Sequence, residues 1–217
     1  MPTCCSAEAI AGQFDRQEAD AELRRYRLDG PLPTTRALID ALGAKGVADA
    51  ELLDIGAGVG AIHHALLKRG ARRAVHVDIS RDYIGAARSE VERLGHEKRV
   101  EFVQGDFVAL APNIAPADVV TLDRVICCYP DVTNLVTASA RKARRIYGAV
   151  FPRDRVAVRL AIVIENLVKR IRGSAFRSYL HPPAVIDDLL QQAGFSRQRT
   201  QRTWFWEVVV YARTPTQ

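Results

Sequence analysis

The segment Leu53-Asp54-Ile55-Gly56-Ala57-Gly58-Val59-Gly60 decides the fold of this chain. A mostly apolar run, Glu51 to Ile55, leads into the glycines and predicts a buried strand, and Ala61 to Lys68 predicts a helix directly after them. Alternating glycines let the backbone turn tightly and approach a ligand closely. The first amide groups of the helix point toward that ligand. This order predicts a ligand site at the carboxyl edge of an α/β sheet.

Predicted strands and helices alternate along the rest of the chain. The other expected strands span residues 74–78, 100–103, 117–122, 147–151, 197–205 and 207–213. The other expected helices span residues 81–94, 132–145, 155–172 and 183–193. Such alternation predicts a mostly parallel sheet with helices on both faces. The last two strands are close in sequence, so we expect them to pair antiparallel.

The first part of the chain is polar and charged and ends in Gly30-Pro31-Leu32-Pro33, which predicts a helical lead-in and a turn. Thr34 or Thr35 is expected to cap a helix that runs to about Leu42 and stops at Gly43. We therefore divide the chain into an N-terminal helical lid over residues 1–43 and one domain over 44–217. A helical insertion is expected at about residues 153–180.

The bulk composition fits one globular domain. Of 217 residues, 48% are hydrophobic and 26% are charged. No stretch has the pattern of a signal peptide or the ~18 apolar residues of a spanning helix, so we expect a cytoplasmic protein.

The cysteines form two adjacent pairs, Cys4-Cys5 and Cys127-Cys128. Neither pair has zinc-site spacing, so free thiols and no metal are expected, with a bridge or a shared metal as the alternative.

The chain is basic, with a net charge of +6 and a pI near 9.4. Positive charge can attract a nucleic acid, an anionic membrane or an acidic substrate, but a solvated arginine-rich face explains it more simply. Residues 155–172 predict a basic amphipathic helix with Arg159, Asn166, Lys169 and Arg170 on one face. It either covers the site or the sheet, or it makes a peripheral membrane contact.

The loop reads D-x-G-x-G-x-G and not the dinucleotide pattern G-x-G-x-x-G. An acidic residue before the glycines is unfavourable beside a pyrophosphate and favourable beside a cationic amino-acid group. This loop resembles motif I of the class I S-adenosylmethionine-dependent methyltransferases. The resemblance implies S-adenosylmethionine as cofactor and a Rossmann-like fold, with a seven-stranded, mostly parallel sheet and an antiparallel last strand. A tight turn without a ligand is the alternative.

Acidic residues also stand at the ends of the next strands. With them, the resemblance covers the segment from about Glu51 to Phe151. Asp78 would accept the ribose hydroxyl protons, and Asp106 would bind the adenine amino group with an apolar neighbour on the ring. Plain helix caps or turns at these positions are the alternatives. The expected cofactor-binding residues are Asp54, Gly56, Ala57, Gly58, Gly60, Asp78, Ile79, Gly105, Asp106, Phe107 and Asp123.

The segment T-L-D-R-V-I-C-C-Y-P-D, residues 121–131, is expected to face the methyl group and its acceptor. Asp123 is placed nearest the transferring methyl. The segment is not the N-P-P-Y type that serves base methylation, which argues against a DNA amino-methyltransferase.

The C-terminal half resembles the magnesium-protoporphyrin IX methyltransferases and their relatives. The similar stretches are F-P-R-D-R-V-A-V-R-L and F-R-S-Y-L-H-P-P-A-V-I-D-D-L-L-Q-Q-A-G-F, and that family makes a carboxylate ester. Cys128 stands where the family carries a histidine, a difference on the substrate side. A hydroxyl or amine acceptor would need a base, for which His181 is the first candidate and Tyr26 the second.

Arg153 and Arg177 are candidates for holding an acidic acceptor. The predicted function is S-adenosylmethionine-dependent transfer of a methyl group to a small-molecule carboxylate or hydroxyl, with a magnesium-protoporphyrin-like acceptor left open. Nucleic acid is not the expected partner. An RNA methyltransferase, a nicotinamide oxidoreductase on the same architecture and a non-catalytic binding protein are the alternatives. The sequence distinguishes neither O-, N- and C-methylation nor the oligomeric state.

Overall fold

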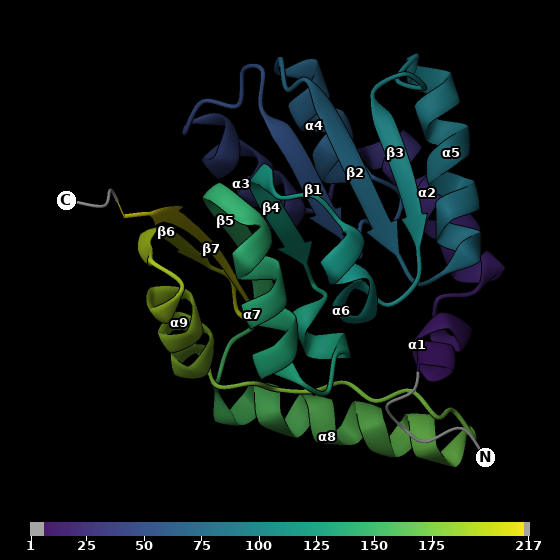
Figure 1. Cartoon of the computed structure of the whole chain (residues 1–217). Coiled ribbons are helices and arrows are strands. Elements are labelled where there is room, and N and C mark those ends of the chain that lie inside the picture. Colours follow the sequence, from purple (N-terminus) through teal and green to yellow (C-terminus); the bar gives the residue numbers. More distant parts are fainter. Residues whose placement is uncertain (1–6, 215–217) are drawn as a thin grey trace.

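The computed structural model describes residues 7–214 (Figure 1). Its α-helices are α1 (Ala7–Gln13), α2 (Arg16–Asp29), α3 (Pro33–Gly43), α4 (Ala61–Lys68), α5 (Arg81–Leu94), α6 (Phe107–Leu110), α7 (Val132–Lys142), α8 (Val156–Ile171) and α9 (Pro183–Gln192). Its strands are β1 (Glu51–Ile55), β2 (Arg73–Asp78), β3 (Val100–Gln104), β4 (Ala117–Asp123), β5 (Ala143–Pro152), β6 (Phe195–Arg202) and β7 (Trp206–Arg213). Two 3-10 turns are η1 (Ala111–Asn113) and η2 (Ile126–Cys128).

The seven strands form one sheet in the order β3-β2-β1-β4-β5-β7-β6. β7 runs antiparallel to both of its neighbours, and the other pairs are parallel. The expected seven-stranded, mostly parallel sheet with an antiparallel last strand is confirmed. The chain order reverses at β1 and β4, which is where ligands bind in open α/β sheets.

Apolar cores cover both faces of the sheet because successive strand residues point to opposite sides. Leu53 and Ile55 of β1 face the core beneath α7 and α9, whereas Leu52, the residue before them, faces the core beneath α3 and α4. α3 packs on β5 and β7, and its Leu38 is fully buried beside Gly148.

Several predicted boundaries differ from the structure, and two of the differences have a clear physical reason. The helix expected over 132–145 ends at Lys142, because buried Ala143 already pairs with Ala117 as the first residue of β5. Neither Thr34 nor Thr35 caps α3: Leu32 holds the cap position, Pro33 begins the helix, and both threonines are buried inside its first turn. A proline at the first helical position has no amide to satisfy, which makes it a favourable start.

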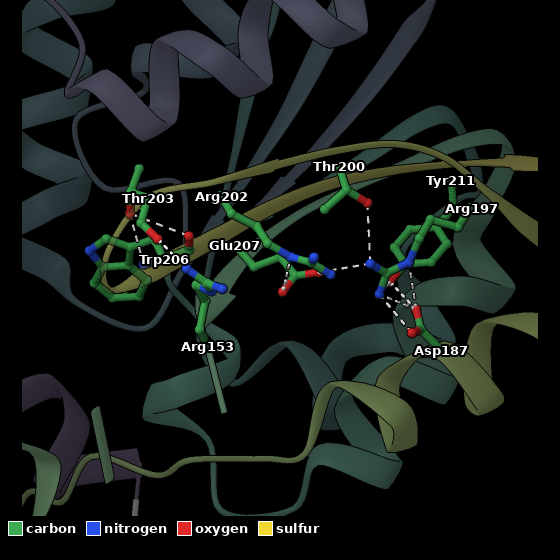
Figure 2. A network of polar contacts seen from close by, with 9 residues as sticks. All are labelled: Arg153, Asp187, Arg197, Thr200, Arg202, Thr203, Trp206, Glu207 and Tyr211. Carbon is green, nitrogen blue, oxygen red and sulfur yellow. Dashed lines mark hydrogen bonds and ion pairs between the residues drawn. The ribbon is translucent and has the colours of Figure 1, made fainter. Parts of the chain in front are cut away.

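Two elements outside the alternating pattern position the site. Figure 1 shows α8 lying across the carboxyl ends of the strands, and the chain after it returns along the helix toward α9. The hairpin β6–β7 is joined to α9 by a polar network around Arg197 (Figure 2). No helix within residues 7–214 is long and apolar enough to cross a membrane.

Candidate functional site

A cavity of about 430 Å³ opens at the carboxyl ends of β1, β2, β3 and β4. Parallel strands end at the same edge of a sheet, so residues far apart in sequence meet there. Ten of the predicted cofactor residues line the cavity: Asp54, Gly56, Ala57, Gly58, Asp78, Ile79, Gly105, Asp106, Phe107 and Asp123. The volume lies within the range of about 300–1,000 Å³ that small-molecule sites occupy.

The glycine loop requires glycine at two positions for different reasons. Gly56 has a φ of 59°, and a Cβ there would collide with the side chain of Val125 in the loop after β4. Gly60 has a φ of 83° and begins α4, where a Cβ would collide with the ring of His63. Gly60 does not line the cavity, so it shapes the helix start behind the ligand-facing loop.

Asp54 is almost fully buried, and both of its carboxylate oxygens have partners inside the protein. Oδ1 accepts a hydrogen bond of 2.6 Å from Thr121 Oγ1, and Oδ2 lies 3.0 Å from His63 Nδ1. Asp54, the acidic residue of the predicted motif, is therefore held in place by side chains from β4 and α4. His63 was not among the predicted site residues, although it stands one helical turn after Gly60 in the sequence.

His63 belongs to a group of four buried histidines with His64, His76 and His96. The rings of His63 and His64 lie 4.4 Å apart, and His64 Nδ1 is 3.2 Å from His96 Nδ1. Burial lowers the pKa of His64 to about 2 and that of His76 well below its ordinary value. The rings of His64 and His76 are therefore neutral at physiological pH. Within the described part of the chain, no group of three or more His, Cys, Asp or Glu side chains is arranged to hold a metal.

Asp78 ends β2 and stabilises the two loops around it. Its Oδ2 accepts a hydrogen bond of 3.0 Å from the amide of Gly58, and its Oδ1 accepts one of 2.9 Å from the amide of Ser80. Burial raises the pKa of Asp78 to about 6, against the opposing effect of the two amides. Ser80, and not Asp78, caps α5.

Asp106 follows β3 and caps α6 by accepting from the amide of Val108 at 2.9 Å. Its carboxylate also accepts from the hydroxyl of Tyr129, which lies 3.0 Å from Oδ2. Tyr129 lines the cavity and comes from the C-C-Y-P segment, but it was not predicted as a site residue. Tyr129 lies beside Asp106 because two loops that are apart in the sequence come together, so no local sequence pattern indicates this contact.

Asp123 ends β4 and is held by two groups that were not among the predicted site residues. Thr35 of α3 donates to Oδ2 at 2.5 Å, and Arg124 Nε lies 3.3 Å from Oδ1. Arg124 has a φ of 61°, a conformation that non-glycine residues adopt at a cost of roughly 1–3 kcal/mol. Burial raises the pKa of Asp123, while Arg124 and Thr35 act in the opposite direction.

Cys127 and Cys128 both line the cavity, with their sulfur atoms 3.8 Å apart, and both are free thiols. Cys4 and Cys5 lie outside the described residues. Cys128 therefore lies in the wall of the cavity beside the buried Cys127.

The structure does not bring His181 and Tyr26 to the cavity lining. His181 Nε2 donates to the carbonyl of Tyr129 at 2.9 Å, and its ring stacks on Tyr179. Tyr26 packs in an apolar cluster with Val59 and Tyr83, where burial raises its pKa. Both side chains hold neighbouring segments in place.

Arg153 and Arg177 also bind backbone groups. Arg153 donates to the carbonyl of Thr203 at 2.8 Å, and Arg177 donates to the carbonyls of Ser174 and Phe176. Neither arginine lines the cavity. The arginines that do are Arg25 of α2 and Arg124.

On the side away from the sheet, residues from α1, α2, α8 and the segment after α8 line the cavity. Phe14 lies edge-to-face between Tyr83 and Phe176, with ring centroids 5.9 and 5.7 Å apart. The closing residues that sequence reasoning missed are Phe14, Glu22, Arg25, Ile162, Glu165, Lys169 and Phe176. They come from helices and connecting segments whose sequences carry no ligand motif, so only the fold reveals them.

Comparisons with known proteins agree with this geometry. The family described as methyltransferase domain matches residues 52–146, which contain the glycine loop and the ends of β2, β3 and β4. Magnesium protoporphyrin IX methyltransferase from Synechocystis PCC 6803, solved with bound S-adenosylhomocysteine, has a TM-score of 0.73 and is 22% identical. The similarity covers 96% of this chain and 100% of that one.

An O-methyltransferase family protein from Burkholderia thailandensis has a TM-score of 0.70 at 20% identity, over 94% of this chain and 62% of that one. Among curated sequences, a ribosomal protein L11 methyltransferase from Serratia proteamaculans is 29% identical over 143 residues, which is 60% of this chain and 49% of the relative. The chain thus spans about half the length of the curated relatives it matches.

The matched domain contains the glycine loop and the four acidic strand ends that form the cavity, and the full-length structural similarities establish the fold. S-adenosylmethionine is the cofactor of the proteins that share this domain. Residues 52–146 thus match a methyltransferase domain, and the chain has the fold of the class I S-adenosylmethionine-dependent methyltransferases.

Proposed function

We propose that this protein transfers a methyl group from S-adenosylmethionine to an oxygen of a small-molecule acceptor, a carboxylate or a hydroxyl. The observation that carries the proposal is the placement of Asp54, Asp78, Asp106 and Asp123 at the ends of four adjacent strands around one cavity. The match to a methyltransferase domain argues against a nicotinamide oxidoreductase.

The residues around the glycine loop fit the cofactor. Each oxygen of Asp78 accepts one backbone amide and has a lone pair left, so the ionised carboxylate can accept the two ribose hydroxyls. Asp106 is oriented by Tyr129 toward a donor such as the adenine amino group, and Phe107 and Ile79 offer apolar surface for the ring. Asp54 has two internal partners, so we infer that it fixes the loop, with Thr121 and His63 as its supports.

The acceptor half of the cavity contains Asp123, Arg124, Cys128 and Lys169. S-adenosylmethionine supplies a methyl group that is already electrophilic, so the protein mainly has to align the acceptor with it. A carboxylate acceptor is ionised at neutral pH and needs no base, and Arg124 and Lys169 are cations in reach of it. A hydroxyl acceptor needs a base, and Asp123 is our candidate among the carboxylates that line the cavity.

Two measurements test the proposal. Isothermal titration should detect binding of S-adenosylhomocysteine and none of nicotinamide dinucleotides, and the reverse result contradicts the cofactor assignment. Incubation with methyl-labelled S-adenosylmethionine and a set of acceptors, magnesium protoporphyrin and other carboxylates and phenols, should give a labelled product. Alkali releases label from an ester and leaves an ether or a methylamine intact, so alkali-stable label on nitrogen contradicts O-methylation.

Asp123→Asn distinguishes the two acceptor classes. With a hydroxyl acceptor, kcat should fall by about 10²–10⁴-fold, the usual contribution of a general base. With a carboxylate acceptor, the variant should keep most of its kcat. Label that enters only ribosomal protein or RNA fractions would refute a small-molecule acceptor.

A further inference from the structure

The helix α8 has two apolar faces that meet different surroundings. On the inner face, Val158 and Ile162 are buried, and Glu165 and Lys169 join Ile162 in the cavity lining. Asn166 also points inward, where it exchanges two hydrogen bonds of 2.8 Å with the backbone of Ser178. The predicted polar face is therefore divided, because Lys169 and Asn166 turn inward while Arg159 and Arg170 are exposed.

The outer face of α8 exposes a continuous apolar stripe. Of the nine large apolar side chains that are exposed within residues 7–214, seven lie on this 16-residue helix, with exposed fractions from 39% to 84%. The stripe consists of Val156, Leu160, Val163, Ile164, Leu167, Val168 and Ile171. Their spacing of three and four residues places them on one side of the helix. Contiguous exposed apolar surface of this kind marks an interaction site.

Basic side chains border this stripe. From Arg155 to Arg172 the chain has five basic residues and one acidic residue, Glu165. Glu165 is paired with Lys169 at 2.5 Å, and Arg159 is paired with Asp154 just before the helix at 2.6 Å. Arg155, Arg170 and Arg172 are exposed and have no ion pair with a described acidic residue. The border of the stripe is therefore cationic.

We propose that the outer face of α8 docks on an anionic phospholipid surface, with the apolar stripe at the boundary of the acyl chains and the bordering arginines on the head groups. An apolar face with arginine or lysine along its edges is the composition of helices that lie in a membrane interface. A second copy of the chain fits less well, because two stripes in contact would bring these unpaired arginines together. The inner face of the same helix lines the cavity. Docking therefore places this wall of the cavity next to the lipid surface.

Co-sedimentation with vesicles tests this proposal on the whole chain. Vesicles of phosphatidylcholine with 30% phosphatidylglycerol should sediment the protein, and vesicles of phosphatidylcholine alone should sediment far less of it. The double variant Leu160→Glu/Leu167→Glu should bind the anionic vesicles at least about tenfold more weakly, since it places two carboxylates in the stripe. Both positions are exposed, so circular dichroism and binding of S-adenosylhomocysteine should not change.

Leu28→Glu is the control, because Leu28 is a leucine on α2, outside the stripe, and is even more exposed than Leu160 and Leu167. This variant should bind vesicles as the wild type does. A second variant, Arg170→Gln/Arg172→Gln, should lose the preference for anionic vesicles.

Three results would overturn the proposal. The first is that the wild type fails to sediment with anionic vesicles at low salt. The second is that the Leu160→Glu/Leu167→Glu variant binds as strongly as the wild type, which would show that net charge alone causes binding. The third is that light scattering shows a wild-type dimer that this variant dissociates, with no vesicle binding, which would assign the stripe to a second copy.

Discussion

At the residue scale, the glycine loop combines backbone and steric constraints at Gly56. Its positive φ excludes most side chains, and the loop after β4 occupies the space where a Cβ would be. This second constraint joins the cofactor loop to Val125, two residues after Asp123. The two halves of the cavity are thus in direct contact.

Gly56→Ala should therefore weaken binding of S-adenosylhomocysteine by at least about tenfold and lower stability by roughly 2–4 kcal/mol, from backbone strain plus displacement of Val125. Gly46→Ala is the matched control, since Gly46 has a φ of 79° and open space around it. It should cost only about 1 kcal/mol and leave binding unchanged. Denaturant unfolding and titration calorimetry measure both effects, and equal losses in the two variants would contradict the steric argument.

We expect Asp78 to make cofactor binding depend on pH. Its pKa of about 6 lies above the ordinary 3.8, so the folded protein keeps a proton there that the unfolded chain has released. This carboxyl therefore lowers stability as pH rises from about 4 to 6. Ribose hydroxyls need the ionised form, so affinity for S-adenosylhomocysteine should rise about tenfold from pH 5 to pH 7.

Titration calorimetry at several pH values checks this dependence. Asp78→Asn should bind more weakly at pH 7 and show a much flatter pH profile. A wild-type affinity that stays constant over this range would show that the Asp78 carboxylate does not contact the ligand.

At the element scale, Arg197 joins α9 to the hairpin β6–β7. Its guanidinium binds both carboxylate oxygens of Asp187 at 2.6 Å and Glu207 Oε1 at 2.7 Å (Figure 2). Tyr211 donates to the same Asp187 at 2.6 Å. These contacts attach the antiparallel end of the sheet to the helix that packs beside α7.

Arg197→Lys should lower the free energy of unfolding by about 1–3 kcal/mol, because an ammonium group cannot reproduce the forked contacts with Asp187 and Glu207. Arg202→Lys is the control, since Arg202 is about half exposed and contacts only Glu207 among acidic residues. It should cost no more than about 0.5 kcal/mol. Neither arginine lines the cavity, so affinity for S-adenosylhomocysteine should stay the same in both variants, and a loss in either would contradict this separation.

At the scale of the whole molecule, residues from the sheet and from α1, α2 and α8 line the cavity together. A ligand that binds only the folded state raises stability by about 2.7 kcal/mol at a hundred times its Kd. For a domain of this size, S-adenosylhomocysteine should therefore raise Tm by about 5–10 °C, at 2–4 °C per kcal/mol. A thermal shift assay measures this, with NAD at the same concentration as control, and equal shifts with both ligands would contradict a selective site.

Much of the fold could be predicted because its determinants are local. The apolar run Glu51–Ile55, the glycines after it and the alternation of later segments each follow from neighbouring residues. The start of β5 could not be placed in this way, since Ala143 joins a strand only through its pairing with Ala117. The candidate site divides similarly: acidic residues at strand ends were predictable, whereas Thr35, His63 and Tyr129 reach those acids from remote segments.

Neighbouring residues fix the class of fold, the glycine loop and the four acidic strand ends, because a strand, a tight turn and a helix start depend on adjacent residues. Long-range packing sets what each acid contacts, keeps His181 and Tyr26 outside the cavity lining, and gives α8 one face on the cavity and an apolar face outside. These features arise where segments far apart in sequence pack together, and packing at such distances leaves no periodic pattern along the chain.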